Sequence, residues 1–180
     1  MKLDLFSTPI WIGNIDASKV KLVEQQLRPT FESKVNTTFN EGFGSKIQES
    51  SLEYLLTSLV SILDETIKLP YKIYLENIWE NSYNQEDFQE KHTHPGSDLS
   101  FVIYKKVEQA NTVFVNPADK LLDAYYIHCK RKQDLFGCSP FAPKCRENQI
   151  IIFPSYLEHY VKKTSNSVTI SGNLKLNFDV

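Results

Sequence analysis

Two of the chain's four histidines lie two residues apart, at the start of the stretch HTHPGSDLSF. In an extended strand, side chains at positions i and i+2 point to the same face, so His92 and His94 can direct two imidazoles at one point. A third ligand has to come from elsewhere, and His159 in the stretch FPSYLEHYV is the candidate. Three imidazoles suit Fe, Cu, Ni or Zn and leave coordination positions open for substrate and oxygen. The pattern therefore indicates a metal centre with open positions.

Other interpretations compete with this metal site. An isolated histidine is usually a surface residue or a buried group with satisfied hydrogen bonds, and a His-x-His pair alone does not exclude this. His128 and the three cysteines form a second candidate set for zinc, but their spacing matches no usual zinc pattern. These cysteines are Cys129, Cys138 and Cys145. The basic run at residues 130–132 is typical of a solvated loop.

The composition is that of an ordinary globular protein, and it limits the partners that we expect. The 180 residues suit one domain over residues 1–180, with 41% hydrophobic and 23% charged residues. A net charge of −2 with both signs interspersed gives no nucleic-acid signal, and no apolar run has the length of a membrane helix. The odd number of cysteines and the lack of a secretory signal favour the reducing cytoplasm. We expect a small-molecule or peptide substrate, no membrane, and compatibility with a homodimer.

The elements that must position the histidines are predicted to be helices first and strands afterwards. A first helix is expected over residues 17–27, with Asp16 as its N-cap. A second helix is expected from about Ser51 to Lys68, because its leucines repeat at helical spacing and give one apolar stripe. The stripe consists of Leu52, Leu55, Leu56, Leu59 and Leu63. Such a stripe is typical of a helix that packs on a sheet.

Five later segments are rich in β-forming residues and are predicted to be strands: YKIYLENIW, LSFVIYKK, NTVFVNP, NQIIIFP and SVTISGNLKLNF. Helices followed by a run of strands favour an α+β fold, with helices backing an antiparallel sheet. The segment from Ala118 to Asn148 is long for a connection and is a candidate lid or binding loop. We expect its residues Tyr126 and Arg131 to contact the substrate, which the sequence does not narrow to a peptide, a sugar or a nucleotide.

Three stretches together contain an ordered series of motifs. They are FSTPIW, IWENSYNQEDFQEKHTHPGSDLSFVIY and IIIFPSYLEHYVKKTSNSVTISGNLKLNF. In order, they contain a Trp-x-Asn pair, His-x-His-Pro, a Ser-x-x-x-Tyr strand and Phe-Pro-Ser-x-Leu-x-His. This set resembles the 2-oxoglutarate/Fe(II)-dependent oxygenase family, in a prolyl-hydroxylase-like branch found in bacteria and in T4-like and marine bacteriophages. The resemblance implies that Trp79 and Asn81 lie on the substrate side, and a phage-encoded protein would work in the host cytoplasm.

The resemblance implies a mainly β fold, the double-stranded β-helix or cupin-like jelly roll, with N-terminal helices packed on one sheet. It implies Fe(II) as cofactor, 2-oxoglutarate as cosubstrate, and a dioxygenase, most simply a hydroxylase, that converts 2-oxoglutarate to succinate. His92, His94 and His159 take the ligand positions, and His94 stands in the place of the usual carboxylate. Asp98 is the nearest carboxylate that could replace His94 as a ligand.

The chain departs from the resemblance at the end that would bind the cosubstrate's distal carboxylate. An Arg normally meets this group in an ending of the type Arg-Ile-Ser-Ile-Ser-Phe-Asn, but here the stretch is SVTISGN and Ser167 takes that place. A hydroxyl does not replace a charged, bidentate guanidinium. Phe101 replaces a usual Gly beside the metal strand. The candidate contacts to the carboxylate are Ser167, Tyr104, Asn173, Lys175, Lys105, Arg131 and Arg146.

These departures leave two alternatives open. One is a three-His, cupin-type dioxygenase that uses the metal without 2-oxoglutarate. The other is a jelly-roll binding protein that has kept the fold and has no catalytic activity.

Overall fold

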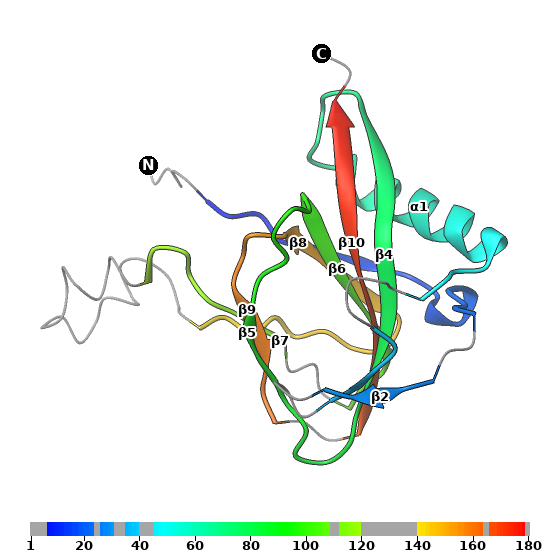
Figure 1. Ribbon diagram of the computed structural model, residues 1–180. Coiled ribbons are helices and arrows are strands. Elements are labelled where there is room, and N and C mark those ends of the chain that lie inside the picture. The colour runs from blue at the N-terminus through cyan, green and yellow to red at the C-terminus, as the bar shows by residue number, and fades with distance from the viewer. Residues whose placement is uncertain are drawn as a thin grey trace, which may run out of the picture.

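The computed structural model describes residues 7–23, 26–30, 35–39, 45–108, 112–119, 140–163 and 166–178 (Figure 1). The larger of its two antiparallel sheets contains, in spatial order, β1 (Trp11–Asn14), β8 (Gln149–Pro154), β6 (Leu99–Lys106), β10 (Ser167–Phe178), β4 (Tyr71–Tyr83), β3 (Asn36–Thr37) and β2 (Arg28–Pro29). The smaller sheet contains β5 (Gln89–His92), β9 (His159–Val161) and β7 (Thr112–Phe114). This is the mainly β jelly roll that we expected from the sequence.

Figure 1 shows the helix α1 (Glu49–Leu63) and the smaller sheet on opposite sides of the long strands β4 and β10. The central strand β6 therefore buries both of its faces. Phe101 and Ile103 pack in the core that includes α1, and Val102 and Tyr104 pack in the core on the other side. A strand covered on both faces needs apolar residues at almost every position. The run LSFVIYKK thus reads as a continuous apolar stretch that ends in two lysines.

The helix α1 buries three of the five leucines in the stripe that the sequence predicts and leaves Leu52 and Leu56 partly exposed. Leu55, Leu59 and Leu63 are completely buried against the larger sheet. The helix ends at Leu63 and not near Lys68, and a turn follows in which the N–H groups of Thr66 and Ile67 both donate to the carbonyl of Leu63. Neither α1 nor any other helix in the described ranges has the length and apolar character needed to cross a membrane.

The predicted helix over residues 17–27 is wrong, although its N-cap is right. The Asp16 side chain accepts from the backbone N–H of Ser18, but only one 3₁₀ turn follows, η1 (Ala17–Lys19). The chain then extends, because the N–H of Val23 donates to the carbonyl of Lys46 and Leu22 forms a β-bridge with Ile47. Within the described residues, one α-helix therefore packs on the sheet, where the resemblance implied several.

Candidate metal centre

The three histidines come together where the smaller sheet begins. His92 is the last residue of β5 and His159 the first residue of β9, and the two are directly opposite each other in the antiparallel pair. Their ring centroids are 4.2 Å apart. His94 lies past the end of β5, where its backbone N–H donates to the carbonyl of Ser155 (2.9 Å). The strand is thus shorter than the sequence suggested, yet His92 and His94 still face one point.

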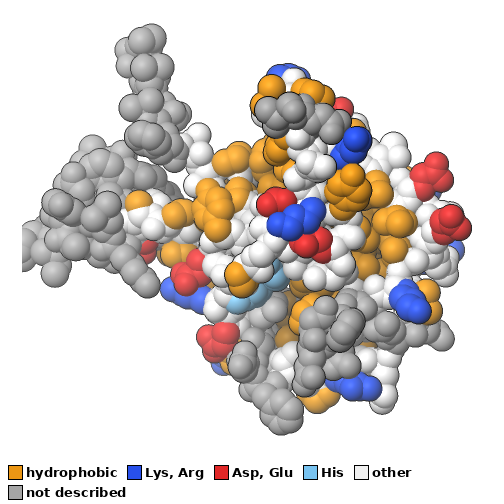
Figure 2. Space-filling view, turned by 45° about the horizontal axis from the view of Figure 1, so that its top comes forward, with side chains coloured by type: hydrophobic (Ala, Val, Ile, Leu, Met, Phe, Trp, Pro, Cys, Tyr) orange, Lys and Arg blue, Asp and Glu red, His pale blue; other side chains and the backbone are white. Residues whose placement is uncertain are grey.

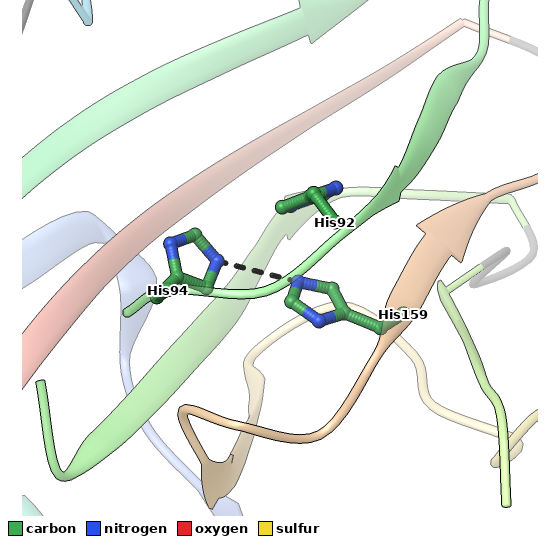
Figure 3. A group of neighbouring side chains, drawn as sticks. All are labelled: His92, His94 and His159. Carbon is green, nitrogen blue, oxygen red and sulfur yellow. Dashed lines mark hydrogen bonds between the residues drawn. The ribbon is translucent and has the colours of Figure 1, made fainter. Parts of the chain in front are cut away.

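The three imidazole rings lie around this point (Figure 3). One ligand atom from each of the three rings lies within 4.8 Å of the others, and Nε2 of His94 is 3.4 Å from Nε2 of His159. Backbone carbonyls hold two of the rings: Nδ1 of His92 pairs with Glu90 (2.7 Å) and Nδ1 of His159 with Leu157 (2.9 Å). A carbonyl only accepts, so Nδ1 carries the proton and Nε2 keeps its lone pair. Such carbonyl contacts orient metal-binding histidines in general.

The separation of His94 and His159 fits a shared metal ion. Two nitrogens that each lie about 2.1 Å from one ion are about 3.0 Å apart at a right angle and about 3.4 Å apart at the tetrahedral angle. The 3.4 Å between the Nε2 atoms of His94 and His159 lies within this range. The residues present therefore suit a divalent transition metal bound through three neutral nitrogens.

The electrostatic environment keeps the cluster neutral. Burial lowers the pKa of His159 to about 3, with further lowering from the neighbouring His92. Burial and the same neighbour lower the pKa of His94 to about 4, and burial also lowers the pKa of His92. Protons therefore compete poorly with a metal ion for these nitrogens at neutral pH.

Asp98 points away from the cluster, although it was the alternative ligand to His94. Its Oδ2 accepts a 2.8 Å hydrogen bond from the N–H of Leu176, and its Oδ1 lies 3.5 Å from Nζ of Lys175. Both carboxylate oxygens thus bind strand β10, and the ligand group found among the described residues consists of histidines alone.

An inner pocket extends from the histidines into the space between the two sheets. Apart from the histidines, its polar side chains are uncharged amides and hydroxyls. They are Asn81, Tyr83, Gln89, Tyr104, Thr112, Ser167, Thr169 and Ser171. Burial raises the pKa of the Tyr83 and Tyr104 phenols, so both keep their protons. None of the described residues that line this pocket is Lys, Arg, Asp or Glu.

Strand β10 supplies a row of hydroxyls to this pocket. Ser167, Thr169 and Ser171 alternate along the strand, so their side chains lie on the same face. Opposite them, Tyr104 donates to Oγ1 of Thr112 (2.9 Å). The sequence pointed only to Ser167 and Tyr104, and the alternation Ser-x-Thr-x-Ser is the signal for the remainder of the row.

The described cations that we considered for the cosubstrate lie outside the pocket. Lys175 pairs with Asp98, and Lys105 donates to Glu80 (2.8 Å). Arg146 lines a separate surface cavity beside Asp16. The structure therefore brings Ser167 and Tyr104 to the pocket but places none of these three cations there.

Phe101 is accommodated by a glycine on the neighbouring strand. Gly172 is its direct partner in the β6–β10 pair. A Cβ added at Gly172 would lie 2.5 Å from Cζ of Phe101 and 2.7 Å from the backbone oxygen of Asn77. The phenyl ring thus fills the space that a side chain at position 172 would need, and the glycine makes room for the bulky residue in β6.

An outer groove of about 600 Å³ also reaches His92 and His94. Trp79 forms part of its wall, 5.0 Å from Phe39 in an edge-to-face arrangement and 5.8 Å from His94 between ring centroids. Figure 2 shows histidine surface at the bottom of a hollow on this side of the molecule. Trp79 and Asn81 line both the groove and the inner pocket.

Other predicted residues lie elsewhere. Asn173 lines the outer groove and not the inner pocket. Its Oδ1 accepts a 2.8 Å hydrogen bond from Ser100. Cys145 is buried in the apolar core between the sheets. Several residues fall outside the described ranges: Tyr126, His128, Cys129, Arg131 and Cys138.

Comparison with known proteins identifies a family model over the part of the chain that builds this site. The model described as "Putative 2OG-Fe(II) oxygenase" matches residues 77–172, just over half of the chain. The match includes all three histidines and most of the inner pocket. No curated protein matches the chain.

Solved structures of similar architecture share the fold at low sequence identity. A 2OG-Fe(II) oxygenase family oxidoreductase from Burkholderia pseudomallei is 13% identical, with a TM-score of 0.51 over 83% of this chain and 71% of its own. A Pseudomonas putida prolyl-4-hydroxylase is 13% identical, with a TM-score of 0.50 over 83% and 77%. HygX from Streptomyces hygroscopicus, solved with nickel, 2-oxoglutarate and hygromycin B, is 8% identical, with a TM-score of 0.53 over 93% and 83%.

Proposed function

This chain belongs to the 2OG-Fe(II) oxygenase family, and on that premise we propose that it is an Fe(II)- and 2-oxoglutarate-dependent dioxygenase that hydroxylates an organic substrate. The observation that carries the proposal is the convergence of three imidazoles, each with one ligand nitrogen, beside the inner pocket. His92, His94 and His159 would hold the iron. Bound Fe(II) and 2-oxoglutarate would supply oxygen activation coupled to decarboxylation of the cosubstrate to succinate.

The chain's own residues contribute position and exclusion of water. The carbonyls of Glu90 and Leu157 hold two imidazoles in the ligand tautomer before any metal arrives. The inner pocket runs from the histidines along β10 to Ser167, and its cavity of about 30 Å³ has to widen to admit the cosubstrate. Its apolar walls, which include Phe153, keep solvent from the reacting atoms.

The substrate would approach from the outer groove. This groove adjoins the inner pocket at His92 and His94, so a substrate in the groove would lie next to the metal. Trp79 offers an aromatic wall next to His94, which suits a flat or apolar part of the substrate. Tyr126 and Arg131 remain candidates for further substrate contacts.

Succinate formation from 2-oxoglutarate tests the proposal. Protein reconstituted with Fe(II) under argon and then exposed to oxygen should produce succinate, and His159→Ala should abolish it. Tyr156→Ala is the matched control, because that side chain lies three residues away and is 62% exposed. Wild-type protein that retains iron yet neither binds nor consumes 2-oxoglutarate would disprove the proposal.

A second candidate is a dioxygenase that uses the metal without 2-oxoglutarate. Two observations favour it: the ligand set contains no carboxylate, and Ser167 stands at the pocket end in place of a cation. Thermal unfolding of the iron-loaded protein separates the two, because a ligand that binds only the folded state raises the melting temperature. A rise with 2-oxoglutarate supports the first candidate, and an unchanged melting temperature supports the second.

A further inference from the structure

The turn between β8 and β9 contacts two of the three histidines of the metal centre. The carbonyl of Leu157 accepts from Nδ1 of His159 (2.9 Å). The carbonyl of Ser155 accepts from the backbone N–H of His94 (2.9 Å). The turn itself is closed by a 2.9 Å hydrogen bond from the N–H of Leu157 to the carbonyl of Pro154. The position of this turn therefore affects both ligands at once.

The contact with His94 is important because the main chain is what holds this residue in place. Carbonyls hold Nδ1 of His92 and of His159, but no carbonyl in the described part of the chain holds Nδ1 of His94. The backbone of Ser155 bonds instead to both ends of the short segment that His94 begins. Its carbonyl accepts from His94, and its N–H donates to the carbonyl of Asp98 (3.1 Å).

The side chain of Ser155 fastens the turn to the larger sheet. It is completely buried, and its Oγ lies 2.8 Å from Oγ of Ser100 in β6. Ser100 donates to Oδ1 of Asn173 (2.8 Å), which is its direct partner in β10. A hydroxyl has one proton, so Ser155 has to be the donor in its bond with Ser100. We call this buried chain of hydrogen bonds from Ser155 through Ser100 to Asn173 the serine–asparagine row.

Burial makes the row costly to break. All three side chains are buried, so water does not readily replace a partner that is removed. A buried polar group that loses its partner retains the full cost of its desolvation. The native arrangement is therefore strongly favoured, and removal of either serine interrupts the same chain of bonds.

We propose that Ser155 and Ser100 are positioning residues of the metal centre, an inference that rests on the proposed function because it takes the histidines as ligands. The serine–asparagine row fixes the turn against β6 and β10. The turn in its place positions the main chain of His94 and the ring of His159. Neither serine lines the inner pocket or the outer groove, so their influence passes through these two ligands.

Competition between the protein and a chelator for Co(II) tests the row without catalysis, and the visible absorption of bound Co(II) reports its coordination geometry. Ser155→Ala should bind Co(II) roughly ten- to hundredfold more weakly than the wild type, with a changed spectrum. Ser100→Ala should have a similar effect. The double variant should stay within about threefold of the weaker single variant, because both substitutions break the same row.

Ser45→Ala is the matched control. Ser45 belongs to another buried hydroxyl pair, 2.6 Å from Oγ1 of Thr38, and it lines neither the inner pocket nor the outer groove. Its removal should lower the melting temperature, because a buried hydroxyl loses its partner. The Co(II) affinity should stay within about threefold of the wild type, and the spectrum should not change.

Several outcomes would overturn the inference. One is unchanged Co(II) affinity and spectrum in Ser155→Ala. Equal weakening in Ser45→Ala is another, because a general loss of stability would then explain the effect. Losses that multiply in the double variant would show that the two serines act independently. If Ser155→Ala does not fold, Ser100→Ala decides the matter, since it leaves the turn itself intact. A wild-type protein that binds no Co(II) would instead refute the metal centre and the proposed function with it.

Discussion

Acidification should destabilise the metal-free protein steeply through its buried histidines. The folded state lowers the pKa of His94 from 6.5 to about 4 and that of His159 from 6.5 to about 3. Below pH 6.5 the unfolded chain takes up protons at these positions and the folded protein does not. Their contribution to stability is therefore complete above pH 6.5, falls as the pH falls, and stops falling only near the folded pKa values.

The size of the effect follows from the same values. Between pH 7 and pH 5, an unfolded histidine with a pKa of 6.5 gains about 2 kcal/mol from protonation, which a histidine that stays neutral in the fold does not gain. The two residues together should cost about 4 kcal/mol over this range. His92 adds to the loss in the same direction, because burial lowers its pKa too. Such a loss is a large part of the 5–15 kcal/mol typical of folded domains.

Urea unfolding in the presence of a chelator, at pH 7, 6 and 5, measures this loss. The variant His159→Gln removes one of the two groups, so its loss between pH 7 and pH 5 should be about 2 kcal/mol smaller than that of the wild type. Carboxylates titrate in both proteins and cancel in the difference. An identical pH dependence in the two proteins would refute the reasoning, because it would mean that His159 is protonated in the fold.

Three further predictions concern the core and the frame of the site. Leu59→Ala removes a completely buried side chain and should lower the free energy of unfolding in urea by about 2–5 kcal/mol, and a loss below 1 kcal/mol would contradict the packing of α1. Gly172→Ala should cost about 1–3 kcal/mol in the same assay, and Phe101→Leu should relieve only part of it, because the backbone oxygen of Asn77 blocks the new methyl as well. Asp98→Asn should leave metal affinity, measured by competition with a chelator, within about threefold, because the carboxylate binds β10; complete loss of metal would make Asp98 a ligand.

The strands were readable from the sequence because their signal is local. The runs LSFVIYKK and SVTISGNLKLNF coincide with β6 and β10; burial on both faces explains the apolar run of β6, and the alternation of polar and apolar residues marks β10. The prediction of a helix over residues 17–27 was wrong because the structure there depends on distant partners. The helical propensity was overridden by pairing of residues 22 and 23 with residues 46 and 47, and no local pattern reports such a distant partner.

The site likewise has features that local sequence predicts and features that depend on distant contacts. The spacing of His92 and His94 made them co-facial candidates, but their meeting with His159 depends on the β5–β9 register, which joins segments more than 60 residues apart. The neutrality of the inner pocket also depends on folding, since Lys105 and Lys175 were plausible contacts until their partners Glu80 and Asp98 were known.

The position of His92 and His159 across β5 and β9 has a mechanical consequence. Strand β5 has four residues and pairs with β9 alone in its sheet, so it is an edge that few hydrogen bonds hold in place. An ion bound by both histidines would cross-link β5 to β9. Binding of the ion would therefore add to the hydrogen bonds that join β5 to β9. A substitution that loosens β5 would release the ion without altering a single ligand, and a chelator would loosen the edge without touching the backbone.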